Sequence, residues 1–453
     1  MTTTHSATAG AQQPATHTDH DAALRFITCG SVDDGKSTLI GRLLVDSKAV
    51  LQDHLAGVTK SGETDLALLT DGLSAEREQG ITIDVAYRYF ATEQRKFIIG
   101  DAPGHEQYTR NMVTAASQAD AAVVLVDATK LDWKNPQLEL LAQTRRHSLL
   151  VHLLRVNALV FAVNKLDAIE DPALAFAHIR NALAAFAQAA GITVEATIPV
   201  SALKGWNVVG RESGWAGYQG PSLLEVLEKL PNTPADTGLP LAFPVQWVEK
   251  FSSSADTSQG RRVFWGRVAA GSARVGDAVQ ILPSGQQAVI AQVVNHARVP
   301  GNVDANLSAG ITLDREVDVS RGDWIIAAPK AAAAASGDDF DTPAVQPAWN
   351  ASREITATVA WMDDEALVPG RVYWALHGHR WVKAKVRRVL HRLAIQTLER
   401  EAAEQLEPNA IGRVELVLQE AIPAAPFLQA RQLGAMILVD TASHKTSGAV
   451  LVE

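Results

Sequence analysis

The sequence predicts an α/β domain followed by two all-β barrel domains. Short apolar runs alternate with helical segments between residues 22 and about 235. Short strands with turn residues follow from Ala242 to about Ala328, and strands dominate again from about Pro347. Alternation of strands and helices is typical of a mainly parallel sheet covered on both faces. Many short strands at close spacing indicate a barrel.

We therefore divide the chain into five parts. These are a disordered tail (1–21), an α/β domain (22–235), a first β-barrel (240–330), a linker (331–346) and a second β-barrel (347–453). The expected α/β strands are Phe26–Cys29, Val85–Ala91, Lys96–Gly100, Ala121–Asp127, Ala158–Asn164 and Ala196–Val200, with a helix over Asp171–Ala190. Ligands of such sheets bind at the carboxyl ends of the strands.

The amino-acid composition argues against some classes of protein function. The chain has 41 Lys and Arg against 50 Asp and Glu, a net charge of -9, which argues against a protein that mainly grips nucleic acid. The single cysteine, Cys29, permits no intrachain disulfide and fits a reducing, cytoplasmic compartment. No apolar run is long enough to predict a membrane span, and residues 1–20 lack the pattern of a signal peptide.

A phosphate-binding loop is predicted directly after the first strand. It comprises Gly30, Ser31, Val32, Asp33, Asp34, Gly35, Lys36 and Ser37, with Thr38 beginning the helical stretch that follows. The pattern G-x-x-x-x-G-K-[ST] between a strand and a helix cradles phosphate oxygens with backbone N–H groups. Lys36 is expected to reach the β- and γ-phosphates, and the Ser37 hydroxyl to bind Mg²⁺.

Two further segments carry residues suited to sensing a γ-phosphate. Thr82 lies in the stretch Glu76–Asp84, where its hydroxyl and carbonyl could complete the Mg²⁺ shell on a loop that switches with the phosphate. Asp101, Ala102, Pro103, Gly104 and His105 follow the strand Lys96–Gly100. We expect Asp101 to hold Mg²⁺ through water, the Gly104 N–H to sense the γ-phosphate and His105 to orient an attacking water.

A base-binding site is predicted after two later strands. Its residues are Asn164, Lys165, Leu166 and Asp167, and Ser201, Ala202 and Leu203. The Asp167 carboxylate can accept from N1–H and the 2-amino group of guanine, a donor pair that adenine lacks. A backbone N–H of Ser201–Leu203 can donate to the guanine O6. Together the motifs predict an α/β P-loop GTPase domain followed by two all-β barrel domains, with GTP and Mg²⁺ as cofactors.

These residues resemble the translational GTPases, the family of elongation factor Tu. Glu76–Ile83 and Asp101–His105 carry the specific part of the match. In that family the histidine after the D-x-x-G motif positions the hydrolytic water. The resemblance thus implies catalytic roles for His105, Lys36 and Thr82, and metal ligation by Ser37, Thr82 and Asp101.

Within that family the chain resembles the large subunit of bacterial sulfate adenylyltransferase. The matching stretches are Thr28–Leu44, Asp71–Phe90, Pro103–Met112 and Gln143–Ser148. The resemblance implies a GTP-hydrolysing subunit of a nucleotidyltransferase that makes adenylylsulfate and pyrophosphate from ATP and sulfate. It also implies a separate small subunit that transfers the adenylyl group, in a heterodimer or higher assembly. Ala102 stands where Thr is usual, and Lys130–Ala142 resembles an insertion of unassigned role.

Two features of the last domain have competing interpretations. Arg380, Lys383, Lys385, Arg387, Arg388 and Arg392 form a basic stretch that is either a partner- or RNA-binding surface or, as we prefer, the solvated face of a strand pair. His377 and His379 flank Gly378, and without further ligands at metal-binding spacing we interpret them as a loop.

Two other functions remain open at this stage. An elongation-factor-like GTPase that binds aminoacyl-tRNA fits the three-domain plan, although Asp34 and the acidic balance speak against it. A non-catalytic scaffold with an inactive nucleotide site ranks last, because all of the motif residues are present.

Overall fold

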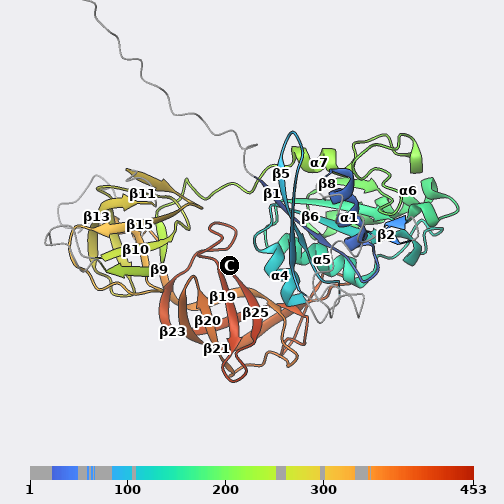
Figure 1. The fold of residues 1–453 in the computed structure, drawn as a ribbon. Coiled ribbons are helices and arrows are strands. Elements are labelled where there is room, and N and C mark those ends of the chain that lie inside the picture. Colours follow the sequence, from blue (N-terminus) through green and yellow to red (C-terminus); the bar gives the residue numbers. More distant parts are fainter. Residues whose placement is uncertain are drawn as a thin grey trace, which may run out of the picture. The chain divides into compact units, whose positions relative to one another are not determined.

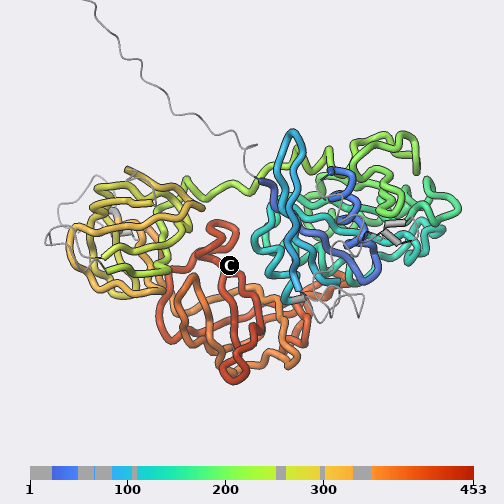
Figure 2. Tube along the Cα trace, viewed as in Figure 1, coloured from blue at the N-terminus to red at the C-terminus, as the bar shows by residue number. Residues whose placement is uncertain are grey.

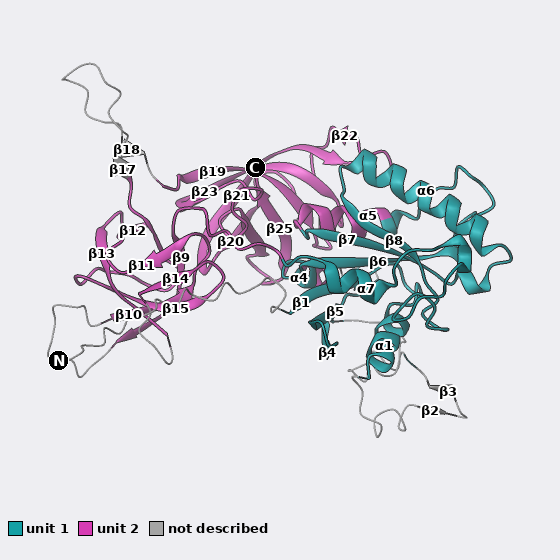
Figure 3. Cartoon of the chain, turned by 90° about the horizontal axis from the view of Figure 1, so that it is seen from above, with its two compact units in different colours: residues 1–104, 114–144, 156–232 teal, residues 105–113, 145–155, 233–453 magenta. Residues whose placement is uncertain are grey.

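The computed structural model describes residues 23–48, 59–60, 63–64, 66, 84–104, 109–250, 262–295, 301–331, 345–346 and 348–453. The chain divides into two compact units (Figure 3). The first takes residues 1–104, 114–144 and 156–232, and the second takes 105–113, 145–155 and 233–453. The expected tail over residues 1–21 and the central part of the expected linker, residues 332–344, lie outside the described residues.

A six-stranded sheet organises the first unit, in the order β4-β5-β1-β6-β7-β8 (Figure 1). Its strands are β1 (Leu24–Cys29), β4 (Ala86–Ala91), β5 (Lys96–Asp101), β6 (Ala121–Asp127), β7 (Ala158–Asn164) and β8 (Val194–Pro199). Neighbours run parallel except at the edge, where β4 is antiparallel to β5. The prediction of a mainly parallel sheet is confirmed. A separate pair joins β2 (Thr59–Lys60) and β3 (Glu63–Thr64).

Helices bury both faces of this sheet. Every residue of β6 and β7 is buried, as expected for central strands covered on two sides. In Figure 3, α1 and α7 lie on one side of the sheet and α6 on the other. Among the described residues, the α-helices are α1 (Lys36–Asp46), α4 (Thr109–Ala116), α5 (Ala142–Leu153), α6 (Pro172–Ala190) and α7 (Leu223–Lys229); the short 3₁₀ helices there are η4 (Ala128–Lys130), η5 (Leu166–Ala168) and η6 (Trp215–Gly217).

Local sequence signals fix the ends of α6. The Asp171 side chain accepts a hydrogen bond from the Leu174 N–H, and Pro172 occupies the first turn, where its missing N–H costs nothing. Gly191 ends the helix in the left-handed region, with a φ of 68°. The helix expected over Asp171–Ala190 is therefore confirmed, with Asp171 as its cap. None of the helices in the described part of the chain combines the length and apolarity that crossing a bilayer requires.

The strand registers pair the carboxyl ends of neighbouring strands. Thr28 of β1 pairs with Asp101 of β5, and Asp127 of β6 pairs with Asn164 of β7. Because these strands are parallel, their carboxyl ends share one edge of the sheet, beside β1, where the strand order reverses. Such an edge is where α/β sheets bind ligands.

The first strand-rich part of the second unit is a closed barrel in the order β10-β15-β13-β12-β16-β9. Its strands are β9 (Ala242–Lys250), β10 (Arg262–Arg267), β12 (Ala278–Leu282), β13 (Gln287–Val294), β15 (Ser308–Leu313) and β16 (Trp324–Ala327), and a small sheet pairs β11 (Ser272–Arg274) with β14 (Asn302–Asp304). Inward side chains such as Phe243, Ile281 and Ile311 are fully buried and fill the barrel. The predicted barrel is confirmed.

The last part of the chain forms a second closed set of strands, drawn in orange to red in Figure 2. The order is β20-β24-β25-β19-β23-β21-β22, and β20 also pairs with β21, which closes all of these strands except β22 into a ring. The strands are β19 (Ala351–Trp361), β20 (Val372–His377), β21 (Arg380–Leu393), β22 (Arg400–Glu401), β23 (Ile411–Pro423), β24 (Ala435–Asp440) and β25 (Thr446–Val452); β17 (Lys330–Ala331) pairs with β18 (Val345–Gln346).

The prediction of a loop at His377 is wrong. His377 ends β20 and is fully buried, where its ring stacks on Trp324 with centroids 5.0 Å apart. Its Nε2 donates to the Leu433 carbonyl at 3.0 Å. Gly378 and His379 form the tight turn between β20 and β21. The sequence around His377 does not indicate a core residue, because its contacts, Trp324 and Leu433, are distant along the chain.

The basic stretch of the last domain has the alternation of a half-exposed strand. Along β21, Lys383, Lys385 and Arg387 are exposed, whereas the residues between them are buried. Several of the arginines pair with carboxylates, as Arg388 does with Glu415 at 2.5 Å. These contacts agree with the preferred interpretation, a solvated strand face.

Burial of His377 predicts a loss of stability in acid. Burial lowers the pKa of His377 to about 4, whereas an unfolded histidine titrates near about 6.5. Between these values only the unfolded chain binds the proton, so stability is complete above pH ~6.5 and falls as the pH is lowered toward ~4. At pH 5 the loss is about 2 kcal/mol.

Urea unfolding at pH 7 and pH 5 measures this loss. His377→Gln keeps an N–H donor but does not titrate, so we expect the variant to lose less stability between the two pH values than the unsubstituted chain. Equal losses in both would contradict a neutral buried His377.

Candidate functional site

The phosphate loop connects the end of β1 to the beginning of α1. Gly35 caps α1 with a φ of 94°, and Asp33 has a φ of 61°. A Cβ at Gly35 would lie 2.5 Å from Asn164 Nδ2, so only glycine fits there. The loop thus delivers the N-terminus of α1, with its unpaired N–H groups, to the carboxyl edge of the sheet, as a phosphate site requires.

Three consecutive carbonyl groups of this loop are held by side chains from other segments. The acceptors are the carbonyls of residues 32, 33 and 34. Lys130 donates to the Val32 carbonyl, Lys165 to the Asp33 carbonyl, and Asn164 Nδ2 to the Asp34 carbonyl at 2.8 Å. With its carbonyls bound in this way, the loop is left to offer N–H groups to a ligand, and such a concave set of amides binds anions.

Lys36 lies within the loop and is 7% exposed. Its Nζ donates to the carbonyls of Ser31 at 2.8 Å and Gly30 at 3.2 Å. Burial lowers the pKa of Lys36, and the carboxylates of Asp101 and Asp34 oppose that shift. A cation poorly shielded by water and surrounded by loop amides is suited to phosphate oxygens.

The segment after β5 lies directly against the phosphate loop. Asp101 is 2% exposed and accepts a hydrogen bond from the Thr28 hydroxyl at 3.3 Å. A Cβ at Gly104 would lie 2.5 Å from Lys36 Nζ and 2.9 Å from the Gly30 carbonyl oxygen. The structure therefore brings the segment from Asp101 to Gly104 close to the phosphate loop. His105 and Thr82 lie outside the described residues.

Hydrogen bonds of the Asn164 side chain connect the predicted base-binding segment to the phosphate loop. Its Oδ1 accepts from the Ala202 N–H at 3.0 Å, while its Nδ2 holds the Asp34 carbonyl. Asp167 lies in η5 and is partly exposed, so its carboxylate is accessible to a ligand. Arg42 of α1 donates to the Ala202 carbonyl at 3.2 Å and fixes this segment from the other side. Asn164 is thus the physical link between the phosphate loop and the Ser201–Leu203 segment.

Sequence reasoning missed two residues of this network, Asp127 and Lys130. Asp127 ends β6 and binds Lys165 Nζ at 2.8 Å. Burial alone would raise the pKa of Asp127, but hydrogen bonds from Lys165 and Thr129 hold it below the usual value. Lys130 binds Asp34 at 2.8 Å. An acidic residue at the end of a central strand was the available signal for Asp127, whereas Lys130 matched no motif.

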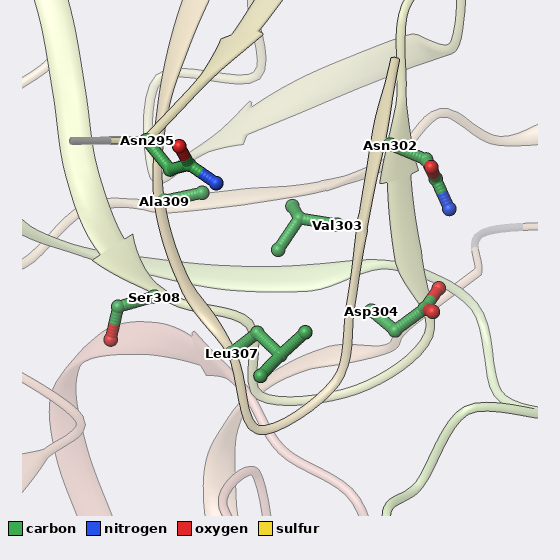
Figure 4. Close-up of a pocket in the computed structure, with 7 residues that line it drawn as sticks. All are labelled: Asn295, Asn302, Val303, Asp304, Leu307, Ser308 and Ala309. Atoms are coloured by element: carbon green, nitrogen blue, oxygen red, sulfur yellow. The ribbon is translucent and has the colours of Figure 1, made fainter. Parts of the chain in front are cut away.

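The described residues also line one shallow pocket of 350 Å³ on the first barrel. Figure 4 shows Val303 and Leu307 between the polar side chains of Asn302 and Asp304 on one side and Asn295 and Ser308 on the other. None of the predicted site residues lines it. The candidate site is therefore the edge of the parallel sheet.

Family models match both ends of the chain. Residues 21–233 match the elongation factor Tu GTP binding domain, and residues 354–453 match the GTP-eEF1A C-terminal domain-like family. The first match covers the phosphate loop, the Asp101 segment and the base-binding residues together. The chain thus carries a GTP-binding domain of the elongation factor Tu type.

Individual relatives match nearly the whole chain. Sulfate adenylyltransferase subunit 1 of Laribacter hongkongensis is 41% identical over 438 residues, which is 95% of this chain and 85% of the relative. The chain belongs to the sulfate adenylyltransferase subunit 1 family. The family member of Vibrio atlanticus is 40% identical over 442 residues, covering 96% of this chain and 86% of its own length.

A longer relative shares the same region. The bifunctional enzyme CysN/CysC of Xylella fastidiosa is 45% identical over 434 residues, which is 94% of this chain. The chain spans 65% of the length of that relative. The similarity therefore concerns one part of the longer enzyme.

Gly104 provides a test of the close approach to the phosphate loop. We expect Gly104→Ala to weaken GTP binding about 5- to 150-fold, since the added methyl meets loop backbone and such overpacking costs about 1–3 kcal/mol. Titration calorimetry with GTP measures the effect. Gly210→Ala is the matched control, because a Cβ there meets nothing within 4 Å. Equal affinity of the two variants would contradict the placement of Gly104.

Proposed function

We propose that this chain is the GTP-hydrolysing subunit of a sulfate adenylyltransferase. The assembly would form adenylylsulfate and pyrophosphate from ATP and sulfate, and GTP hydrolysis on this chain would help to drive that unfavourable reaction. Two observations together support the proposal. Asn164 joins the predicted phosphate loop to the predicted base-binding segment, and relatives named sulfate adenylyltransferase subunit 1 align with the chain over 95% of its length.

The chemistry on this chain would be transfer of the GTP γ-phosphoryl group to water. Such a transfer needs positioning and stabilisation of developing negative charge more than covalent chemistry. Lys36 and the amides of the loop supply positive charge and N–H donors at the phosphate oxygens. The Gly104 N–H, held against the loop, would bind the γ-phosphate, and His105 would orient the attacking water.

The residues present fit a magnesium ion. Ser37 in the first turn of α1 and Asp101 at the end of β5 supply a hydroxyl and a carboxylate, the oxygen ligands that Mg²⁺ prefers. Thr82, predicted from sequence as the third ligand, lies outside the described residues. When bound, the ion would neutralise charge on the β- and γ-phosphates. The protein's own part is to place the Asp101 carboxylate near the ammonium group of Lys36.

Selection of guanine is assigned to Asp167 and the segment Ser201–Leu203. The Ser201 N–H already donates to the Trp206 carbonyl, and the Ala202 N–H donates to Asn164. We therefore propose Leu203, which is 64% exposed, as the amide that reaches the guanine O6. The hydrogen-bonded loop around it gives that amide a fixed position.

The proposal includes a partner, a separate small subunit that carries out adenylyl transfer in a heterodimer or higher assembly. We also propose that the complex acts in the cytoplasm, in keeping with the single buried thiol of Cys29. The aminoacyl-tRNA alternative is not carried forward, because relatives at 40–41% identity bear the name of a sulfate-activating enzyme.

The test of this function follows pyrophosphate release from ATP by the chain co-expressed with a candidate small subunit. We expect release that depends on sulfate and rises when GTP is added. Sulfate-independent release, or no response to GTP while GTP is hydrolysed, would overturn the assignment to sulfate activation but leave the GTPase assignment intact.

The proposed role of His105 in orienting the attacking water can be tested by substitution. We expect His105→Ala to slow GTP hydrolysis by at least about 100-fold, the usual contribution of a positioned catalytic side chain. GTP affinity should stay close to that of the unsubstituted chain, because the role concerns the water and not the nucleotide. Single-turnover hydrolysis together with equilibrium binding separates the two quantities. Unchanged hydrolysis would remove His105 from the mechanism.

A further inference from the structure

Lys130 lies beside the phosphate loop, although no nucleotide-binding motif includes it. It ends the short helix η4, directly after the β6 strand, and its side chain is 33% exposed. Its Nζ donates to the Val32 carbonyl and to Asp34 Oδ1 at 2.8 Å, and lies 3.9 Å from Asp127 Oδ2. One ammonium group thus bonds to both the backbone and a side chain of the loop.

Its main partner, Asp34, is a carboxylate inside a site built for anions. Asp34 is 0% exposed, and its Oδ2 accepts from the Ser31 N–H at 2.6 Å. Burial raises the pKa of Asp34, and Lys130 is the foremost group that opposes the shift. A buried carboxylate without a cation is unstable, and next to a nucleotide it would repel the phosphates. The loop therefore needs a cation at this point.

The neighbouring lysines perform other tasks. Lys165 binds Asp127 and the Asp33 carbonyl, and Lys36 donates to the carbonyls of Gly30 and Ser31. In the described part of the chain, the ion pair of the Asp34 carboxylate is the one with Lys130. Neither of the other two lysines replaces that contact, so removal of the Lys130 charge leaves Asp34 without its hydrogen-bonded cation.

We propose that Lys130 is a positioning residue for guanine-nucleotide binding. Its ammonium neutralises Asp34 and holds the Val32 carbonyl, so that the loop presents N–H donors and no uncompensated negative charge to the phosphates. The inference rests on the proposed binding of GTP and deepens it. It places a nucleotide-binding determinant in the Lys130–Ala142 segment, whose role the sequence left unassigned.

Calorimetric titration of the full-length chain with GTP and with GDP tests the proposal. We expect Lys130→Met to weaken GTP binding at least about tenfold, as for truncation of one partner of a buried charge pair. GDP should lose less, because it carries less negative charge to be repelled by Asp34. Lys130→Arg, which retains the cation, should bind GTP within about threefold of the unsubstituted chain.

Two further variants separate positioning from general damage. Lys134→Met is the matched control, since Lys134 lies four residues on, is 69% exposed and contacts Glu170 at 3.6 Å and the ring of Trp133 rather than the phosphate loop. We expect no change in its affinity. The double variant Asp34→Asn with Lys130→Met removes both charges and should recover most of the lost GTP affinity.

The outcomes distinguish the inference from the function on which it rests. If the unsubstituted chain binds no GTP, the proposed function fails. If it binds GTP and Lys130→Met binds equally well, the positioning role fails. Equal losses for GTP and GDP without recovery in the double variant would indicate a merely structural lysine and would likewise overturn the inference.

Discussion

The site depends on the fixation of the phosphate-loop carbonyls by side chains from the ends of β6 and β7. The six residues between the end of β1 at Cys29 and the start of α1 at Lys36 could adopt many conformations, and most of them would turn carbonyl oxygens toward an anion. Asn164, Lys165 and Lys130 each hold one of three consecutive carbonyls. Conformational entropy is thereby lost before a ligand arrives, which is the physical meaning of a preorganised site.

This fixation requires the parallel sheet to be in register. Asp127 and Asn164 are direct neighbours on β6 and β7, and Thr28 and Asp101 are direct neighbours on β1 and β5. A shift of one residue in any strand would turn these side chains to the opposite face. The strands β6 and β7 are apolar up to these last residues and buried along their whole length, and their packing favours that register. The same strand register thus determines both the packing of the hydrophobic core and the positions of the polar site residues.

Much of this was readable from the sequence, because the relevant signals are local. The apolar runs gave β6 and β7 their exact bounds, and the glycines and Lys36 marked the phosphate loop. The pairing of Lys130 with Asp34, 96 residues apart, had no local signal, since a single lysine after a strand is common. The prediction of a loop at His377 is wrong for the same reason, the lack of a local signal. Its burial arises from Trp324 and Leu433, which are far from it along the chain.

The position of Asn164 has a consequence for how the two halves of a nucleotide are recognised. Its amide oxygen holds Ala202 in the base-binding segment, and its amide nitrogen holds Asp34 in the phosphate loop. A single planar group therefore transmits any displacement from one half to the other. In the proposed GTP site, base and phosphates would therefore be bound cooperatively, and substitutions in the two segments would have non-additive effects on affinity. Discrimination of guanine would thus extend to the geometry of the phosphates, where no base contact exists.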